Sequence, residues 1–425
     1  MCWLIMTYDE AISYRNLYLA LKQCVKGVTW KDSVSTYYAN AFKRTYELRR
    51  ELLNDSYKIS KYSIFEIHEP KKREIIATRL KDRQFQKALV DGVIYPCLIS
   101  VFTKTNCACL KNRGTDYAIN LLKQEMRDYY WNNHTNKGWL FQFDIHHYFP
   151  STSLHMAESI ARLYIKDHGT MARVFEIIES FSFSEILHTL KSKGFDHKRA
   201  SNIAFHISTI RARSVYLSCT GTPVNRDEMI NKARRYISDD KLLEHLLFDD
   251  MKGIALGSNV SQLLMLAVLD HLDHILFETY GLHARYMDDF IVITDSKEKA
   301  EQAKMIVVSE LDRLGLALNP KSSLHRLQDG FHFLHWRFIL TSTGMVIIKK
   351  ERGKIAHEHR VLKKLKRRLD DGTYTMDKVR QSFSSWQAHM ETGNTFYQVK
   401  NMREYYFNLF NEVAPNGKFF KNGKN

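Results

Sequence analysis

The feature that most constrains this fold is a set of acidic residues placed inside apolar, strand-like sequence. Asp144 ends the alternating segment FQFD, and Asp288 and Asp289 stand together in RYMDDFIVI, directly before an apolar run. These patterns predict a strand in both places. Neighbouring carboxylates in such strands are costly to bury, because like charges repel and each group loses hydration. We therefore expect a cation between them.

An ordinary structural role is the alternative for each of these acids. An isolated Asp-Asp pair is usually a solvated turn, and an Asp after a strand can cap a helix. That interpretation does not explain why both segments are embedded in hydrophobic strands. Three carboxylates from adjacent strands are what two Mg²⁺ ions about 3.5 to 4 Å apart require. The pattern therefore predicts a two-metal site formed by Asp144, Asp288 and Asp289.

The composition places these acids in a basic protein. The chain has 425 residues, with 63 Lys and Arg against 47 Asp and Glu, which gives a net charge of +16. This excess favours a polyanionic partner, most simply nucleic acid, over a protein whose surface merely happens to be basic. Only 18 Gly and 6 Pro occur, which argues against an all-β protein with many tight turns. We expect a helix-rich α+β enzyme with two or three lobes.

Cysteine usage and hydropathy predict the compartment. The six cysteines follow no regular spacing, and the Cys107 and Cys109 pair has no second Cys or His pair at zinc-ligand spacing. We expect reduced thiols and no zinc site. No run of 18 apolar residues and no basic leader are present. The expectation is a cytoplasmic protein that is neither exported nor membrane-spanning.

Apolar periodicity predicts helices and strands in mixed order. The expected elements are two amphipathic helices over 11–55, a hairpin over 63–76 with a basic tip, helical sequence over 82–98, a strand over 140–145, mostly helical sequence over 153–250, a glycine-bearing turn and apolar helix over 253–276 capped by Ser258 or Ser261, a hairpin over 284–294, a helix over 297–314, an aromatic strand over 331–340 and a basic helix over 360–371.

In this order, the motifs resemble those of reverse transcriptases. YMDD within RYMDDFIVI resembles their catalytic hairpin, and FDIHHYFPST resembles the motif that supplies their first aspartate. IHEPKKREI with KDRQFQKAL resembles the fingers motif that holds the incoming triphosphate, and LKNRGTDYAI resembles the second fingers motif. LGSNVSQLLML resembles the palm helix motif of diversity-generating retroelements and their bacterial relatives. LNPKSS resembles the motif with a lysine near the pyrophosphate, FLHWRF the primer grip, and SFSSWQAHMETGNT the thumb.

This resemblance covers roughly residues 60–410 and points to the prokaryotic branch related to group II introns and diversity-generating retroelements, most like stand-alone defence-associated enzymes. It implies a right-hand polymerase fold of the α+β class, with fingers, a palm whose antiparallel sheet carries YMDD, and a helical thumb. The implied domains are an N-terminal helical segment at 1–60, fingers and palm at 61–340, and a basic thumb at 341–425. A helical insertion at about 165–250 is a candidate RNA-holding or oligomerisation element, although no homo-oligomer is predicted.

The resemblance also implies roles for individual residues. The metal ligands are Asp144, Asp288, Asp289 and the backbone carbonyl of Ile145. The nucleotide-binding residues are Lys71, Lys72 and Arg73 at the phosphates, Phe149 as a gate that excludes a 2′-hydroxyl, Ser261 and Gln262 beside the templating base and the incoming nucleotide, and Lys321 near the leaving pyrophosphate. The nucleic-acid-binding residues are Arg113, Lys363, Lys364, Lys366, Arg367 and Arg368. The alternatives are purely structural roles: a solvated hairpin tip for 71–73, core packing for Phe149, helix capping for Ser261 and Gln262, a solvated loop for Lys321 and a solvated helix for 363–368.

Two positions depart from the family pattern. Leu256 stands where many reverse transcriptases have the glutamine of a P-Q-G sequence, which weakens any inference of high fidelity. His335 replaces the glycine of the primer grip, so the geometry at the primer end is expected to be unusual.

The implied function is RNA-templated DNA synthesis. The expected reaction uses two Mg²⁺ ions and deoxynucleotides to make cDNA from a dedicated structured non-coding RNA, in bacterial antiphage defence. The alternatives within the family are the reverse transcriptase of a diversity-generating retroelement or a retron. A non-catalytic RNA-binding scaffold and an RNA-dependent RNA polymerase are further alternatives, and Phe149 argues against the second.

Overall fold

The computed structural model describes residues 5–68, 72–350 and 352–420. The chain forms two compact units that alternate along the sequence. The first unit comprises Met1–Leu110, Asp144–Ile275 and Ile306–Pro320, and the second comprises Lys111–Phe143, Leu276–Met305 and Lys321–Asn425. Helices and antiparallel sheets occur together, which confirms the predicted α+β class.

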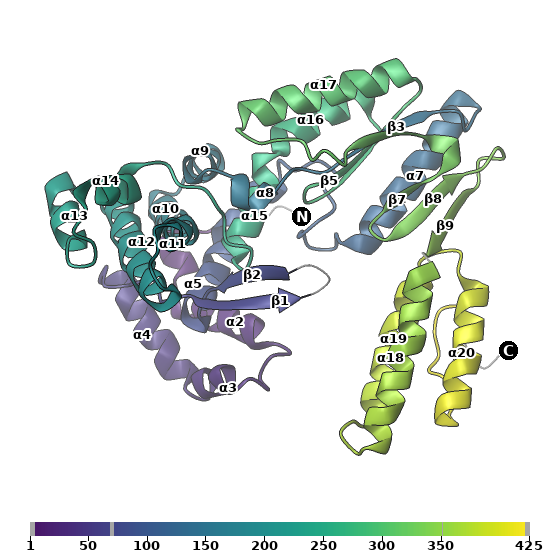
Figure 1. The fold of residues 1–425 in the computed structure, drawn as a ribbon, viewed down its shortest axis with the longest axis horizontal. Helices are drawn as coiled ribbons and strands as arrows, with labels where there is room; N and C mark the ends of the chain where they lie inside the picture. Colours follow the sequence, from purple (N-terminus) through teal and green to yellow (C-terminus); the bar gives the residue numbers. More distant parts are fainter. Residues whose placement is uncertain (1–4, 69–71, 351, 421–425) are drawn as a thin grey trace. The chain divides into compact units, whose positions relative to one another are not determined.

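The first unit begins with four helices where the sequence predicted two. They are α1 (Tyr8–Ala11), α2 (Tyr14–Val25), α3 (Asp32–Ala39) and α4 (Ala41–Leu53). The Ser13 hydroxyl accepts from the backbone of Asn16 and so begins α2 separately from α1. The predicted hairpin is confirmed: β1 (Ser63–His68) pairs antiparallel with β2 (Lys72–Ala77) (Figure 1). Helical sequence then continues through α5 (Leu80–Leu89), a π-helical turn (Val90–Ile94) and α6 (Tyr95–Ile99).

The rest of the first unit is helical, as predicted for residues 153–250. Its helices are α8 (Tyr148–Ser151), α9 (Leu154–Tyr164), α10 (His168–Ser180), α11 (Phe183–Ser192), α12 (His197–Cys219), α13 (Arg226–Ala233), α14 (Asp240–Phe248) and α15 (Asn259–Val268). The Ser258 hydroxyl caps α15 by accepting from the backbone of Ser261, so Ser258 is the capping residue of the two expected. Within the described ranges, no helix is by itself long and apolar enough to cross a membrane, although α15 and α16 (Asp270–Tyr280) pass that test as a bent pair.

A buried ionic network joins the N-terminal helices to the insertion. Arg173 on α10 is fully buried and donates to Glu176 at 2.7 Å, to Asp55 at 2.9 Å and to the Tyr8 hydroxyl at 3.2 Å. Its guanidinium also lies 3.8 Å from the ring centroid of Tyr216, whose hydroxyl bonds to Asp55. Because a buried charge needs such partners, these contacts make the two segments parts of one folded unit.

The second unit contains two antiparallel sheets and α7 (Thr115–Asn133). The four-stranded sheet has the order β4 (His283–Tyr286), β5 (Asp289–Thr294), β3 (Trp139–Phe143) and β6 (Ser323–Arg326). The three-stranded sheet has the order β7 (Phe331–Phe333), β8 (Trp336–Leu340) and β9 (Val346–Lys350). A short 3₁₀ helix (Leu327–Asp329) precedes β7, and α16 and α17 (Lys297–Arg313) each have one end in either unit.

The predicted single strand over 331–340 is wrong. Phe333 pairs with Trp336, and a two-residue turn of Leu334 and His335 separates β7 from β8. Both turn residues have positive φ, 49° and 66°, which is the conformation of a type I′ turn. Such turns normally contain Asn or Gly, so Leu and His gave no turn signal in the sequence.

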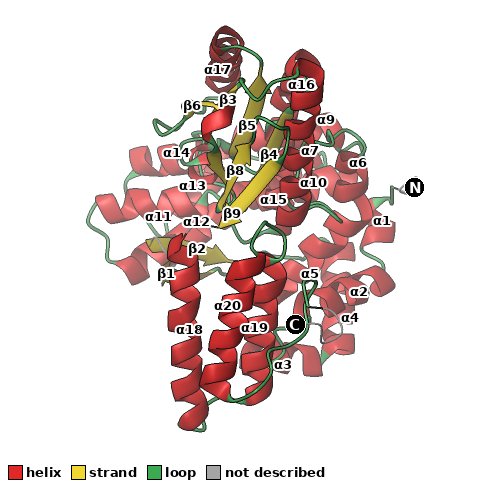
Figure 2. Cartoon of the chain, turned by 90° about the vertical axis from the view of Figure 1, so that its right-hand side faces the viewer, coloured by secondary structure: helices red, strands yellow, loops and turns green. Residues whose placement is uncertain are grey.

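Three helices form the C-terminal bundle of the second unit: α18 (Arg352–Asp370), α19 (Met376–Met390) and α20 (Phe396–Phe410), which lie side by side in Figure 2. Its core includes Leu362, Phe383 and Tyr406. Glu358 on α18 is also buried, and its Oε1 atom has no hydrogen-bond partner among the described residues. Burial raises the pKa of this carboxyl to about 7.

This buried carboxyl predicts a pH-dependent stability. The folded bundle holds the Glu358 proton up to about pH 7, whereas the unfolded chain loses it near pH 4.5, so stability falls as the pH rises between these values. Glu358→Gln is expected to raise the free energy of unfolding at pH 8 by about 3 kcal/mol and to change it little at pH 4.5. Urea denaturation at both pH values measures this. Glu404→Gln, at an exposed position on α20, is the control, and an equal effect of Glu358→Gln at both pH values would contradict the prediction.

Candidate functional site

The acidic pair lies at a strained turn between β4 and β5. Tyr286 pairs with Asp289, so Met287 and Asp288 form the two turn residues of the predicted hairpin, which the structure confirms. Met287 has a φ of 60°, in the left-handed region that favours glycine. A non-glycine residue held there costs about 1 to 3 kcal/mol, and such strain concentrates at functional sites.

A buried cation supports this turn. Arg285, the residue before Tyr286, is 0% exposed and donates from Nη1 to the carbonyl of Met287 at 3.1 Å. Its guanidinium lies 5.5 Å from the ring centroid of Phe290. The sequence analysis assigned no role to Arg285. The available signal was a charged residue within the strand-like segment that precedes the acidic pair.

The register of β3 and β5 sets the positions of the acids along the chain. Phe143, the last residue of β3, pairs with Phe290, the second residue of β5. Their rings stack with centroids 4.3 Å apart. Asp289 directly precedes Phe290, and Asp144 directly follows Phe143. Because the strands are antiparallel, the residue that follows Phe143 and the residue that precedes Phe290 both adjoin this pair along the chain.

Asp144 is held by a residue that the sequence analysis missed. The side-chain amide of Asn319 donates to Asp144 Oδ2 at 2.7 Å, and the Asn319 backbone N–H donates to the Asp144 carbonyl at 2.8 Å. Ile145, whose carbonyl is a predicted metal ligand, is buried and pairs with Leu318. Asn319 lies in the LNPKSS motif, where only Lys321 was singled out. A hydrogen bond to a carboxylate is stronger than a neutral one, so Asn319 orients this group.

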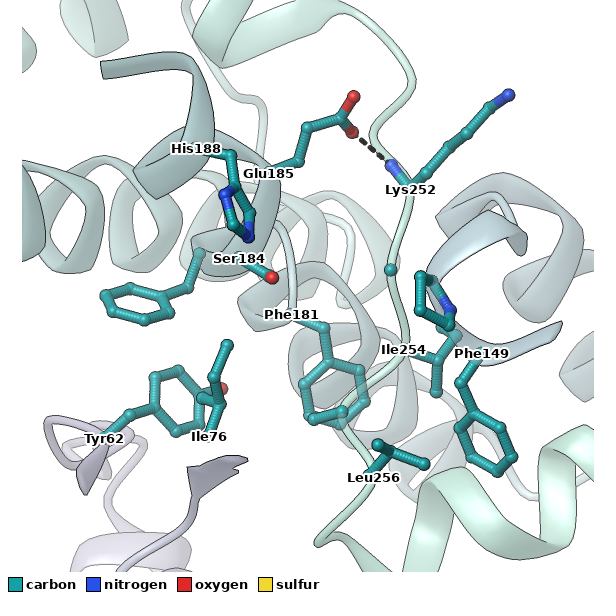
Figure 3. A pocket seen from close by; sticks show the side chains of 14 residues that line it. Tyr62, Ile76, Phe149, Phe181, Ser184, Glu185, His188, Lys252, Ile254 and Leu256 are labelled. Carbon is teal, nitrogen blue, oxygen red and sulfur yellow. Dashed lines mark hydrogen bonds between the residues drawn. The ribbon is translucent and has the colours of Figure 1, made fainter. Parts of the chain in front are cut away.

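Phe149 lines a cavity of about 380 Å³ in the first unit. Figure 3 shows Phe149 and Leu256 on one side of it, Tyr62 and Ile76 on another, and Phe181 between them. The walls therefore come from β2 and the residue before β1, from α8, from the end of the insertion helix α10 and from the segment before α15. The Phe149 side chain is 8% exposed, which places it at the cavity wall.

Polar groups occupy the opposite end of this cavity. Ser184, Glu185 and His188 lie there, and the Glu185 carboxylate accepts a hydrogen bond from the Lys252 backbone (Figure 3). The backbone N–H of Ile254 in turn donates to the Phe149 carbonyl at 2.9 Å. The cavity thus has an apolar end at Phe149 and a polar end supplied by α11.

The remaining predicted residues lie in several places. Ser261 is fully buried and Gln262 is half-buried, both in the first turn of α15. Lys72 and Arg73 are the first two residues of β2, and Lys71 lies outside the described residues. Lys321 is exposed just before β6, and Arg113, just before α7, lies over the Tyr117 ring. On α18, Lys363, Lys364, Arg367 and Arg368 are exposed, whereas Lys366 is half-buried and pairs with Asp370 at 2.7 Å.

The chemistry of the acids fits a hard divalent cation, because carboxylate and carbonyl oxygens are the ligands of Mg²⁺. Within residues 5–68, 72–350 and 352–420, no three His, Cys, Asp or Glu side chains are already grouped as a metal site. The fit to a metal therefore rests on the donor types and on the β3–β5 register.

The Asn319 contact predicts a graded loss of stability. Asn319→Ala removes the hydrogen bond to the Asp144 carboxylate and is expected to lower the free energy of unfolding by about 2 kcal/mol. Asn319→Asp places a second carboxylate beside Asp144 and should cost more. Urea denaturation at pH 7 measures both variants, with Asn202→Ala, at an exposed contact to Lys61, as the control. Wild-type stability of Asn319→Asp would show that the contact does not form.

Comparisons with known proteins give only distant structural likeness. No protein-family model matches the sequence. No curated protein matches it. Among solved structures, it is similar to apo telomerase from Candida tropicalis, with 12% identity, a TM-score of 0.42 and coverage of 83% of this chain and 58% of that one. Telomerase from Candida albicans, solved with a TWJ fragment of telomeric RNA, gives 11% identity, a TM-score of 0.42 and coverage of 83% and 63%. The chain thus spans about three fifths of the length of these telomerase chains.

Proposed function

We propose that this protein is a reverse transcriptase, an RNA-templated DNA polymerase with the right-hand arrangement of fingers, palm and thumb. The observation that supports the proposal is the β3–β5 register, in which Phe143 pairs with Phe290, the residues directly before Asp144 and directly after Asp289. Asp288 directly precedes Asp289 in the strained turn that begins at Met287. Acidic residues at the ends of paired antiparallel strands are a donor set for nucleotidyl transfer.

In this proposal the three aspartates and the Ile145 carbonyl hold two Mg²⁺ ions. When bound, the ions would supply activation of a 3′-hydroxyl and neutralisation of the pyrophosphate. Asn319 keeps the Asp144 carboxylate oriented, and Arg285 keeps the Met287 carbonyl fixed. Both contacts reduce the rearrangement needed at the moment of reaction.

The proposed nucleotide site has Phe149 against the sugar. An apolar wall of Phe149, Leu256 and Phe181 gives a 2′-hydroxyl no hydrogen-bond partner, and burying that group unpaired is unfavourable. Deoxynucleotides therefore fit this wall better than ribonucleotides. Lys71, Lys72 and Arg73 are proposed to bind the triphosphate, with Gln262 and Ser261 beside the base and Lys321 near the pyrophosphate.

The proposed substrate is a dedicated structured RNA that is copied into cDNA. The exposed cations of α18, together with Arg113, suit a phosphate backbone, and the net charge of +16 favours such a partner. A role in antiphage defence is proposed from the enlarged helical insertion and the divergent NCACLKNRG segment. Diversity-generating retroelement or retron enzymes are the alternatives within the same activity.

The acidic pair is testable directly. The double variant Asp288→Asn, Asp289→Asn keeps the side-chain volumes but removes two charges, and primer extension with deoxynucleotides and Mg²⁺ is expected to fall at least about 1,000-fold. Asp295→Asn, which follows the other end of β5, is the matched control and should retain activity. Circular dichroism checks that the folds agree. Undiminished synthesis by the double variant would refute the polymerase proposal.

The sugar gate is tested by competition between nucleotides. Phe149→Val should raise the ratio of ribonucleotide to deoxynucleotide incorporation by about 10- to 100-fold, because the smaller side chain leaves room for a 2′-hydroxyl and for water to solvate it. The ratio is measured within one preparation, so partial unfolding cancels. Phe175→Val, a buried position on α10 outside the cavity lining, should leave the ratio unchanged. A wild-type enzyme that uses both nucleotides equally would show that Phe149 is no gate.

A further inference from the structure

Helix α4 exposes aromatic side chains beside its buried face. Ala41, Thr45 and Leu48 face the core, whereas Phe42 is 66% exposed and Tyr46 is 60% exposed. The two rings are four residues apart and so lie one helical turn apart on the same side of α4. Single exposed apolar side chains are common, whereas neighbouring ones that form a patch more often mark an interaction site.

Phe42 continues a row of stacked rings from α2. Tyr14 and Tyr18 lie with centroids 6.4 Å apart and planes 5° apart, and Tyr18 and Phe42 lie 5.0 Å and 11° apart. The Tyr14 hydroxyl donates to the Phe42 carbonyl at 3.4 Å. Phe42 is one end of this row and is mostly exposed, so a further flat ring can approach it from solvent.

The charges around this row are mostly positive. Helix α2 carries Arg15 and Lys22 and no acidic residue. Helix α4 carries four basic residues, namely Lys43, Arg44, Arg49 and Arg50. Its two acids are engaged by cations: Glu47 lies 3.3 Å from Arg44, and Glu51 lies 2.5 Å from Lys81. The local field therefore complements a polyanion.

We propose that the aromatic platform formed by Tyr14, Tyr18, Phe42 and Tyr46 binds single-stranded RNA. Bases stack on the Phe42 and Tyr46 rings, while the neighbouring Lys and Arg side chains contact phosphates. The choice of RNA rests on the proposed function, in which RNA is the template. A second copy of the chain is the rival occupant. The parallel ring row and the cationic border match a strand of stacked bases better than a protein surface, whose contacts avoid clustered like charges.

The test measures binding of a labelled 12-nucleotide uridine RNA by fluorescence anisotropy. The double variant Phe42→Ala, Tyr46→Ala is expected to weaken binding at least about 10-fold, with an unchanged slope of affinity against salt, because stacking is lost and phosphate contacts remain. Phe42→Trp should retain binding. The matched control is Leu19→Ala, Leu53→Ala, which removes exposed apolar side chains of the same two helices and should leave RNA binding intact.

Photocrosslinking of 4-thiouridine RNA, followed by peptide mapping, should place crosslinks within 41–53. Apart from Phe42→Trp, each of these substitutions replaces an exposed side chain with a smaller one. We therefore expect the variants to keep the fold. Crosslinks only elsewhere, an unchanged affinity of the aromatic variant, or tighter binding of the matching DNA oligonucleotide would overturn the proposal. The proposal would also be overturned if the protein sediments as a dimer that both the aromatic and the leucine double variants dissociate. Because binding needs no catalysis, a polymerase-inactive Asp288→Asn, Asp289→Asn protein that still binds RNA through this platform would separate the two proposals.

Discussion

The pairing of β3 with β5 is the interaction on which the proposed site depends. Phe141, Phe143 and Phe290 form a continuous stack, with centroid distances of 4.9 Å and 4.3 Å. A slip of one residue would turn every β3 side chain to the opposite face, so this buried stack selects one register. That register determines which chain positions adjoin the Phe143–Phe290 pair, and both are aspartates. The packing of this sheet therefore also determines that Asp289 directly precedes the residue of β5 that lies opposite Phe143.

Local patterns in the sequence predicted the strands that carry these acids, and failed where local chemistry was misleading. The hairpin at RYMDDFIVI followed from alternation and an apolar run, because both signals lie within a few residues. The β7–β8 turn did not, because Leu334 and His335 adopt positive φ without Asn or Gly. His335 stands where the resembling motif has glycine, and the structure shows that this position needs a conformation that glycine adopts without strain.

Local sequence patterns could not predict contacts between residues that are far apart along the chain. Asn319 reaches Asp144 across 175 positions of the chain, and Arg173 reaches Tyr8 across 165. Neither the hydrophobic periodicity nor the spacing of residues around Asn319 and Arg173 predicts which residue each one contacts. The Arg173 network shows why the N-terminal helices and the insertion belong to one unit: removing Arg173 would leave the buried Glu176 carboxylate without the cation that is hydrogen-bonded to it. The platform on α2 and α4 is thus carried by a segment anchored to the insertion.

The turn at Met287 places acids near each other at an energetic cost, and Arg285 offsets part of that cost. Its hydrogen bond to the Met287 carbonyl is made by this chain alone and needs no bound metal. Burial among apolar side chains strengthens that bond, because the surrounding dielectric is low. The turn can therefore keep its strained φ before any cation reaches the carboxylates. In the proposed enzyme, the protein orders this part of the site during folding, and substrate binding need not supply that energy.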